Sequence, residues 1–209
     1  MQKTIRANTL VTSLNIRSLP KHHAHLLHDS KIRGRVIGLQ ETWCSKEHDN
    51  DHLKLPGYFL HLVSQGRGKG VATYHTKEFS ISGEVNTDKY QISKVSCNEF
   101  DVLNVYRSLG ANKADFFRDL KKLAPGQRTC VIVGDFNMDF SKEPQERLLK
   151  EISALGFEQL VKSPTHIEGG IIDHVYARHL DQEIEMHMNW PFYSDHAAIS
   201  IVKYHSQNL

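Results

Sequence analysis

The segment of residues 130–134, CVIVG, contains no charged or amide side chain, and it constrains the fold of this chain more than any other segment. A strand that is apolar at every position must be covered on both faces, because a strand with one exposed face alternates apolar and polar residues. The segment therefore predicts a central strand of a layered fold. Asp135 and Asn137 follow it directly, so this buried strand would present a carboxylate and an amide at its end.

Most of the remaining chain consists of short apolar runs separated by turns. We predict about nine strands, some of them joined as hairpins, and amphipathic helices over residues 20–30, 113–123 and 141–155. Hairpin-linked strands of this kind favour two sheets packed face to face, with helices on the outer faces. The predicted fold class is therefore α/β (α+β), a four-layered sandwich of two mainly antiparallel β-sheets flanked by helices. The strand order is not a simple βαβ alternation, which argues against a doubly wound nucleotide-binding sheet.

The composition predicts a single domain over residues 1–209. Hydrophobic residues make up 39% and charged residues 24%, as in ordinary soluble globular proteins. No segment is long and apolar enough to span a bilayer, and the N-terminal residues lack the features of a secretory signal. We therefore expect an intracellular protein that has no membrane association.

Charge and cysteine content narrow the class of protein further. The net charge of +2 argues against a protein that coats nucleic acid, although a local positive groove is compatible with it. The three cysteines show no metal-binding spacing and predict reduced, mostly buried thiols.

Polar side chains recur at the ends of the predicted strands. They are carboxylates, amides, a tyrosine and a histidine: Asn15, Glu41, Tyr106, Asp135, Asn137, Asp173, Asp195 and His196. Each of them alone could be a turn, cap or half-buried strand residue. Because rigid scaffolds display catalytic groups in the loops at strand ends, the whole set favours convergence on one catalytic pocket.

The chemistry of this set indicates a site for a hard cation. Carboxylate and amide oxygens suit Mg²⁺ or Mn²⁺ better than zinc or copper. Hydrolysis of a phosphodiester needs such a cation, together with a base that aligns water and a donor to the phosphoryl oxygens. The residue types therefore point to metal-assisted phosphoryl chemistry.

Six short segments resemble the endonuclease/exonuclease/phosphatase superfamily and occur in its order. They are residues 14–17 (LNIR), 39–42 (LQET), 104–107 (NVYR), 134–137 (GDFN), 172–174 (IDH) and 194–196 (SDH), of which GDFN is the most specific. The superfamily includes apurinic/apyrimidinic endonucleases, deoxyribonuclease I, neutral sphingomyelinases, inositol polyphosphate phosphatases and deadenylases. Residues 172–174 and 193–199 resemble endonucleases of non-LTR retrotransposons, and residues 66–74 and 164–170 resemble those of Helitron transposons.

The resemblance implies a metal site and a base. Glu41 would be the principal ligand of Mg²⁺ or Mn²⁺, and Asn15 and Asp195 would be further ligands. Asp135 would align or deprotonate the attacking water. Many relatives carry an acid where this chain has Arg17, although retrotransposon relatives often lack that acid as well.

The resemblance also implies contacts with the substrate. Asn137 and His196 would stabilise the phosphoryl centre, and Asp173 would fix the tautomer of His196 and keep it cationic. Tyr106 would contact a phosphate oxygen, and Thr165 would contact the DNA backbone.

Two further segments have alternative interpretations. The Gly-rich segment 66–70 predicts a hairpin tip at which Arg67 and Lys69 contact the DNA backbone. The alternative is a plain turn without such a contact. His22, His25 and His28 recur at helical spacing. They could bind a metal, but a solvated helix face is favoured because no cysteine or carboxylate cluster accompanies them.

The resulting hypothesis is a Mg²⁺-dependent endonuclease of a transposable element, nuclear and monomeric, that nicks DNA and leaves a 3′-hydroxyl and a 5′-phosphate. One alternative is another phosphodiesterase or phosphatase of the superfamily, such as an RNA deadenylase or a lipid phosphodiesterase. The other alternative is a DNA-binding module without catalytic activity. Clustered acids argue against that module, because without a metal they would repel phosphate.

Overall fold

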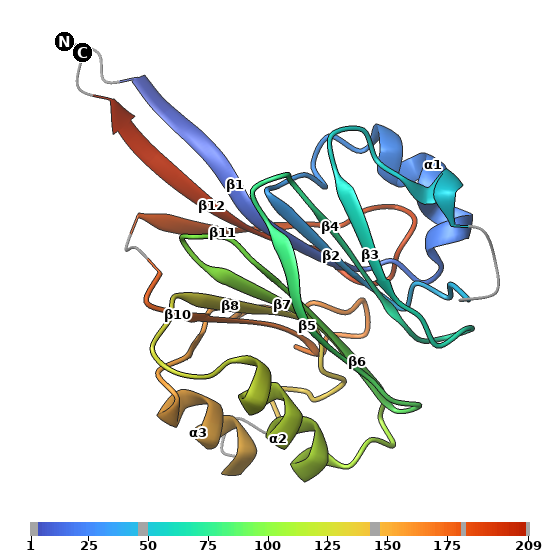
Figure 1. Ribbon diagram of the computed structural model, residues 1–209, viewed down its shortest axis with the longest axis vertical. Coiled ribbons are helices and arrows are strands. Elements are labelled where there is room, and N and C mark those ends of the chain that lie inside the picture. Colours follow the sequence, from blue (N-terminus) through green and yellow to red (C-terminus); the bar gives the residue numbers. More distant parts are fainter. Residues whose placement is uncertain (1–3, 46–49, 143–146, 181–182, 208–209) are drawn as a thin grey trace.

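The computed structural model describes residues 4–45, 50–142, 147–180 and 183–207 (Figure 1). In chain order its elements are β1 (Thr4–Asn15), α1 (Leu19–His28), β2 (Val36–Gln40), the short 3₁₀ helix η1 (Asp51–Leu53), β3 (Phe59–Val63), β4 (Val71–His75), β5 (Ser80–Asn86), β6 (Tyr90–Ser96), β7 (Asp101–Arg107), α2 (Lys113–Leu123), β8 (Cys130–Asp135), α3 (Arg147–Ala154), β9 (Glu158–Gln159), β10 (Asp173–Arg178), β11 (Ile184–Asn189) and β12 (Ala198–Gln207).

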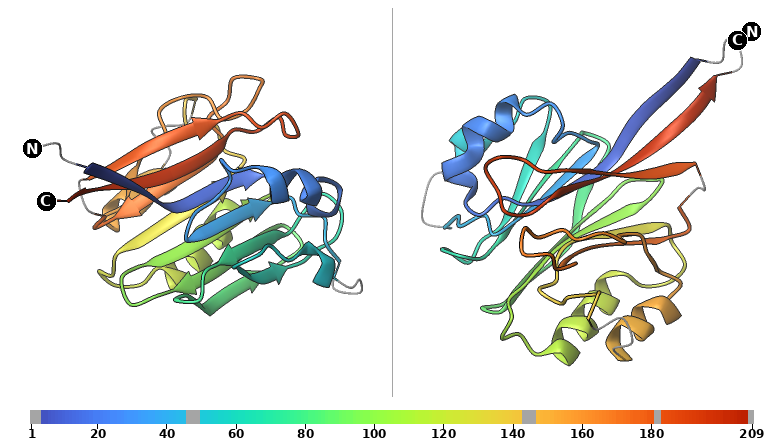
Figure 2. Two further views of the ribbon diagram at one scale, coloured as in Figure 1. Left: turned by 90° about the horizontal axis from the view of Figure 1, so that it is seen from above. Right: turned by 180° about the vertical axis from the view of Figure 1, so that it is seen from behind.

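The strands form two six-stranded sheets. The first sheet has the order β11-β12-β1-β2-β4-β3, and the second has the order β5-β6-β7-β8-β10-β9. Each sheet contains one parallel pair, β1 with β2 and β7 with β8, and the other pairs are antiparallel. Helix α1 lies outside the first sheet, and α2 and α3 lie outside the second (Figures 1 and 2). The predicted four-layered sandwich is confirmed.

Strand β8 lies at the centre of the second sheet, as its apolar sequence predicted. Val131 and Val133 face the first sheet, where they join an apolar cluster between the two sheets. Cys130 and Ile132 face the opposite side and pack in the cluster beneath α2 and α3. Burial of one such aliphatic side chain contributes about 1.5–3 kcal/mol, so both faces of β8 stabilise the sandwich.

A polar layer interrupts the apolar contact between the sheets. The Gln40 side chain donates from Nε2 to Asn104 Oδ1 over 2.6 Å, and Asn104 Nδ2 donates to the carbonyl of Ala72 over 2.9 Å. Gln40 and Asn104 are fully buried. A Cβ atom at Gly38 would lie 2.9 Å from the Asn104 side chain, so the absence of a side chain at Gly38 makes room for this layer. These hydrogen bonds fix the relative position of the sheets.

The strand prediction was incomplete at the sheet edges. Strand β5 was not predicted, because its sequence, SISGEVN, is polar and most of its residues are exposed or half-buried. The two-residue strand β9, at the other edge of the same sheet, was also missed. Within the described residues the third helix spans Arg147–Ala154, and residues 143–146 of the predicted helix lie outside them.

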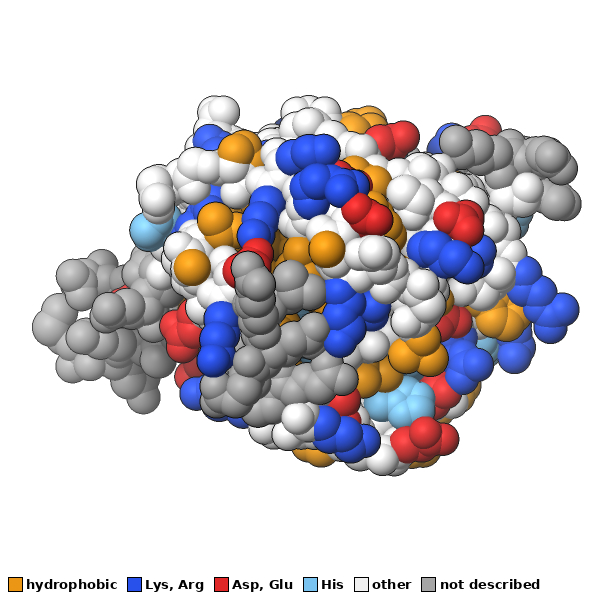
Figure 3. All heavy atoms as spheres, turned by 90° about the horizontal axis from the view of Figure 1, so that it is seen from below, with side chains coloured by type: hydrophobic (Ala, Val, Ile, Leu, Met, Phe, Trp, Pro, Cys, Tyr) orange, Lys and Arg blue, Asp and Glu red, His pale blue; other side chains and the backbone are white. Residues whose placement is uncertain are grey.

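The described surface carries mixed charge on the side of α2 and α3. Figure 3 shows basic and acidic side chains interspersed on the face seen from below, and ion pairs join Arg118 to Asp115 and Lys122 to Asp119. None of the described helices has the length and apolar character needed to cross a membrane. All three cysteines are free, two of them buried and Cys97 half-buried, as predicted.

Candidate active site

The register of the strands brings the predicted polar residues to one edge of the sandwich. Asn15 lies opposite Gln40 in the parallel pair β1 and β2, and Glu41 is the residue that follows Gln40 in the chain. Tyr106 lies opposite Asp135 in the parallel pair β7 and β8. Parallel strands end at the same edge of a sheet, so each pair presents its last residues together. The two strand ends lie on the same side of the molecule, because Asn15 contacts Asp135.

Asp135 is held by hydrogen bonds from two amides. Asn15 Nδ2 donates to Asp135 Oδ2 over 2.9 Å and to Glu41 Oε1 over 3.1 Å, so this amide bridges two carboxylates from different sheets. The backbone N–H of Asn137 donates to Asp135 Oδ1 over 2.8 Å, and its Nδ2 donates to Oδ2 over 3.2 Å. Glu41 and Asn137 both have a φ of 48°. Such positive φ values in non-glycine residues are found where surrounding contacts hold a functional loop.

His196 is oriented by Asp173. The His196 Nδ1 atom lies 2.8 Å from Asp173 Oδ2, and both side chains are buried. The Thr165 hydroxyl in turn accepts hydrogen bonds from the backbone N–H groups of Ile172 and Asp173, over 3.1 and 3.0 Å. A carboxylate bound to Nδ1 fixes the ring with Nε2 directed away from it.

Neighbouring charges and burial shift the pKa values of His196 and Asp135. Burial lowers the pKa of His196, but the adjacent Asp173 carboxylate outweighs burial and raises it to about 9, so the imidazolium persists at neutral pH. Burial and then the charge of Asp173 raise the pKa of Asp135 well above its usual range. A carboxylate with a raised pKa accepts a proton more readily than an ordinary one.

One carboxylate oxygen of Asp195 is suited to a divalent cation. Asp195 Oδ1 is buried and has no hydrogen-bond partner among the described residues, while Oδ2 is ion-paired with Arg17. Ser194 Oγ donates to the carbonyl of Asn15 over 2.7 Å, which ties the Asp195 loop to the strand end next to Glu41. The atom nearest to Oδ1 among the ion pairs is His196 Nε2, at 3.9 Å. A buried carboxylate oxygen without a hydrogen-bond partner is an arrangement that a hard cation satisfies.

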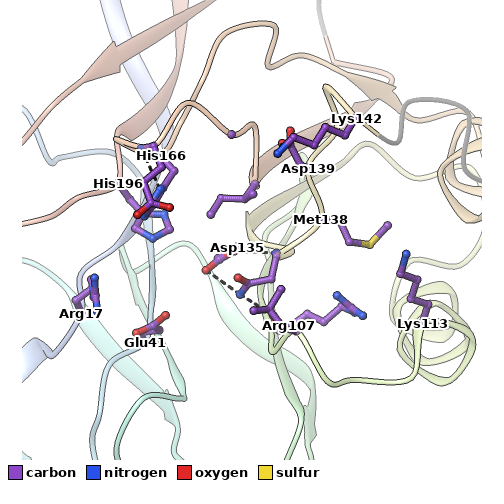
Figure 4. A pocket seen from close by; sticks show the side chains of 15 residues that line it. Arg17, Glu41, Arg107, Lys113, Asp135, Met138, Asp139, Lys142, His166 and His196 are labelled. Atoms are coloured by element: carbon purple, nitrogen blue, oxygen red, sulfur yellow. Dashed lines mark hydrogen bonds and ion pairs between the residues drawn. The ribbon is translucent and has the colours of Figure 1, made fainter.

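These groups open into a cleft of about 620 Å³. Glu41, Asp135, Asn137 and His196 line it, and Figure 4 shows Asp135 and His196 directed toward the same space with Glu41 below them. Glu41, Asp135, Asn137 and His196 therefore share one cleft instead of lying in separate regions.

Tyr106 lies beside this site but is oriented toward the hairpin between β3 and β4. Its hydroxyl donates to the carbonyl of Gly68 over 3.0 Å, and its ring packs on Val63 and Val71. Burial, followed by the charges of Glu41 and Asp135, raises its pKa. The predicted contact of Tyr106 with phosphate stays a prediction, because in this arrangement the hydroxyl holds the hairpin tip.

The predicted backbone-binding residues lie outside the lining of the cleft. The Arg67 guanidinium lies 5.5 Å from the centre of the Trp43 ring, and Lys69 Nζ donates to the carbonyl of Asp88 over 2.7 Å. Thr165 is fully buried. The position of Thr165 favours a role in holding Asp173 over the predicted direct contact with DNA, and DNA contacts of Arg67 and Lys69 stay predictions.

Arg107 and His166 also line the cleft and were not assigned a role from the sequence. Arg107 is buried and donates to the carbonyls of Phe136 and Ala111 over 3.1 and 2.7 Å, and its own carbonyl accepts from Asn137. His166 lies against His196 through an isolated β-bridge. The only signal for His166 in the sequence was its place in the segment 164–170.

The histidines of α1 differ in part from the favoured interpretation. His25 and His28 are exposed, as a solvated helix face requires, but His22 is buried. The rings of His22 and His25 stack on Tyr193 at centroid distances of 5.7 and 5.4 Å. The solvated-face prediction is therefore wrong for His22, because Tyr193 covers that part of the helix.

Comparisons with known proteins agree with this architecture. Residues 10–196 match the model of the Endonuclease/Exonuclease/phosphatase family. An AP endonuclease from Archaeoglobus fulgidus has a similar structure, with a TM-score of 0.71, 17% identity and coverage of 92% of this chain and 98% of that chain. No curated protein matches the sequence.

Two further solved structures have similar folds. The 3′ phosphatase NExo from Neisseria, bound to a product DNA hairpin, has a TM-score of 0.69, 16% identity and coverage of 91% of this chain and 97% of that chain. Truncated TDP2 from Caenorhabditis elegans has a TM-score of 0.65, 15% identity and coverage of 95% and 98%. The family model spans most of the residues and includes every residue of the site described above, and on that match the chain belongs to the endonuclease/exonuclease/phosphatase family.

Proposed function

We propose that this protein is a divalent-metal-dependent endonuclease that nicks DNA and leaves a 3′-hydroxyl and a 5′-phosphate. One observation carries the proposal: Asp135, with a raised pKa, and His196, held by Asp173, face one cleft that also contains Glu41. A proton acceptor, a cationic donor and an oxygen-rich metal site are the parts that phosphodiester hydrolysis requires.

The residues divide the work of the reaction. Asp135 aligns the attacking water and accepts its proton, since Asn15 and Asn137 hold both of its oxygens in place. His196 donates from Nε2 to the phosphoryl oxygens as negative charge builds on them. Asn137 lies beside Asp135 and contributes its amide to the same centre.

Glu41, Asp195 and Asn15 are the residues that would hold Mg²⁺ or Mn²⁺. When bound, the cation neutralises negative charge on the phosphate and on the leaving oxygen. Arg17, which is ion-paired with Asp195, would lie next to this cation and add a fixed positive charge to the cleft.

Two observations support DNA as the substrate class. Basic side chains line the cleft alongside its acids, namely Arg17, Lys113 and Lys142, and they can contact a phosphate backbone. One structure of similar fold was solved with a product DNA hairpin. The resemblance of four segments to mobile-element endonucleases supports an origin in a transposable element and action in the nucleus.

A nicking assay on supercoiled plasmid tests the proposal. With Mg²⁺ or Mn²⁺ the wild-type protein should convert plasmid to open circles, and EDTA should stop the conversion. Sequencing and end-labelling of the nicks should show 3′-hydroxyl and 5′-phosphate ends. Parallel assays with polyadenylated RNA and with phosphoinositide or sphingomyelin vesicles test the other substrates of the superfamily.

Variants connect the activity to the site. Glu41→Gln, Asp135→Asn and His196→Ala should each lower the nicking rate by about 100-fold or more. Glu185→Gln on β11, an exposed acid that is ion-paired with His187, should nick at the wild-type rate. Binding of DNA without any cleavage would instead indicate a non-catalytic module, and near-normal activity in any of the three site variants would refute the assigned roles.

A further inference from the structure

His166 is a second histidine in the cleft. It lines the same space as Asp135 and His196, and Figure 4 shows its ring directly above that of His196. The two ring centroids lie 4.8 Å apart, in an edge-to-face arrangement with an interplanar angle of 74°. The functions assigned above do not use His166.

The loop that carries His166 is held on both sides. Within the loop, His166 N–H donates to the carbonyl of Gly170 over 3.1 Å, and the N–H of Gly169 donates to the His166 carbonyl over 2.8 Å. Across to the His196 loop, Ile167 N–H donates to the carbonyl of Asp195 over 3.0 Å. Backbone hydrogen bonds therefore hold the loop and place the ring of His166.

One hydrogen bond determines which nitrogen of His166 carries the proton. The backbone N–H of Glu168 donates to His166 Nδ1 over 3.2 Å. A ring nitrogen that accepts a hydrogen bond has its lone pair engaged and carries no proton, so the proton of the neutral ring is on Nε2. This N–H points toward the cleft, where its contact with Asp195 Oδ2 is 3.6 Å.

In this tautomer the Nε2 atom of His166 can donate a hydrogen bond but cannot bind a metal. His166, Asp195 and His196 are close enough to suggest a metal site, but a nitrogen that carries a proton cannot bind a cation. The distance to Asp195 is also too long for a hydrogen bond. The Nε2–H group of His166 is therefore a positioned donor that is available to a ligand entering the cleft.

We propose that His166 donates a hydrogen bond from Nε2 to a non-bridging oxygen of the bound phosphate, beside the donor of His196. The inference rests on the proposed phosphodiesterase function and adds a substrate-contacting residue to it.

The tautomer can be tested without activity. In ¹⁵N NMR spectra of the imidazole groups, His166 should show a protonated Nε2 and an unprotonated Nδ1, and titration with inorganic phosphate should perturb Nε2. A proton on Nδ1, or a His166 resonance that does not respond to phosphate while that of His196 does, would overturn the inference.

Variants test the donor in the reaction. His166→Phe keeps a ring against His196 but removes the N–H group, and it should lower kcat for plasmid nicking by about 10- to 100-fold. His166→Gln supplies an amide donor and should recover part of the loss. His187→Phe, at an exposed position on β11, is the matched control and should have the wild-type rate.

The outcomes separate the inference from the proposed function. An active wild-type protein with an equally active His166→Phe variant refutes the inference and leaves the proposed function standing. Equal losses in the Phe and Gln variants, with altered Asp173–His196 resonances, also refute it, because they indicate a structural role. A wild-type protein that does not nick DNA refutes the proposed function, and the phosphate titration then decides the inference by itself.

Discussion

Gly134 determines where Asp135, the proposed base, lies. Its φ of 140° is a conformation that side chains disfavour, and a Cβ atom there would lie 1.9 Å from the carbonyl oxygen of Val105 on the neighbouring strand. Gly134→Ala should therefore push β8 away from β7 and lower the free energy of unfolding by about 3 kcal/mol or more. Urea denaturation measures this loss.

Gly110→Ala is the control for that substitution. A Cβ atom at Gly110 meets no atom within 4 Å, and its φ is not positive, so its stability should stay close to that of the wild type. Equal stability of the Gly134→Ala variant and the wild type would show that β7 and β8 do not approach each other as closely as described.

Arg178 joins strand β10 of the second sheet to the chain before β8 and to the chain after α3. It is the last residue of β10 and is buried. Its Nε donates to the carbonyl of Arg128 over 3.1 Å and its Nη1 to that of Leu155 over 3.2 Å, and its guanidinium lies 4.5 Å from the centre of the Phe157 ring. These contacts hold the chain that follows α3 against the sheet.

Replacement of Arg178 should loosen this layer. Arg178→Met keeps much of the volume but leaves buried carbonyls without a donor, which costs about 3 kcal/mol in the free energy of unfolding. Arg118→Met on the exposed face of α2 should have little effect. Hydrogen exchange should show the loss as faster exchange in α3 and β10, and unchanged exchange there would contradict the role of Arg178.

Acid should destabilise the whole molecule partly through Asp101. Burial raises the pKa of Asp101, but hydrogen bonds from Arg128 and Lys94 outweigh it and lower the pKa below the usual value. The carboxylate therefore contributes stability above its unfolded pKa of about 4, and this contribution is lost as the pH falls through the lower folded value.

Denaturation at a series of pH values tests the role of Asp101. The difference in unfolding free energy between the wild type and Asp101→Asn should be largest at neutral pH and should shrink below about pH 4. Asp88→Asn, at a side chain that is 75% exposed, should follow the wild-type curve. A constant difference between pH 7 and pH 2 would contradict the assignment.

A bound cation should stabilise the entire fold. If the proposed site binds Mn²⁺ in the folded protein and the unfolded chain does not, a concentration of about 100 times Kd should add about 2.7 kcal/mol and raise Tm. EDTA should reverse the shift, and Glu41→Gln should reduce it while Glu185→Gln should not. An equal shift in the wild type and in Glu41→Gln would place the cation elsewhere.

The layers of this protein and its family could be predicted from the amino-acid sequence alone. Burial sets the spacing of apolar residues along the chain, so strand β8 and the three helices could be predicted. The position of Asp135 and Asn137 at the end of β8 followed from that prediction. The order of the six polar segments was enough to indicate the family. Strand β5 could not be predicted, because a polar edge strand is defined by its pairing with β6 and not by its own burial.

Which side chains meet could not be predicted from the sequence and is known from the folded structure. Asn15 touches Asp135, 120 positions further along the chain, and Asn104 closes a polar layer with Gln40. Thr165 acquires its place beneath Asp173, and His166 its place beside His196, from loops that are hydrogen-bonded across the fold. The physical reason is that local periodicity records whether a residue is buried, whereas its partner depends on strand register and on how two whole sheets pack.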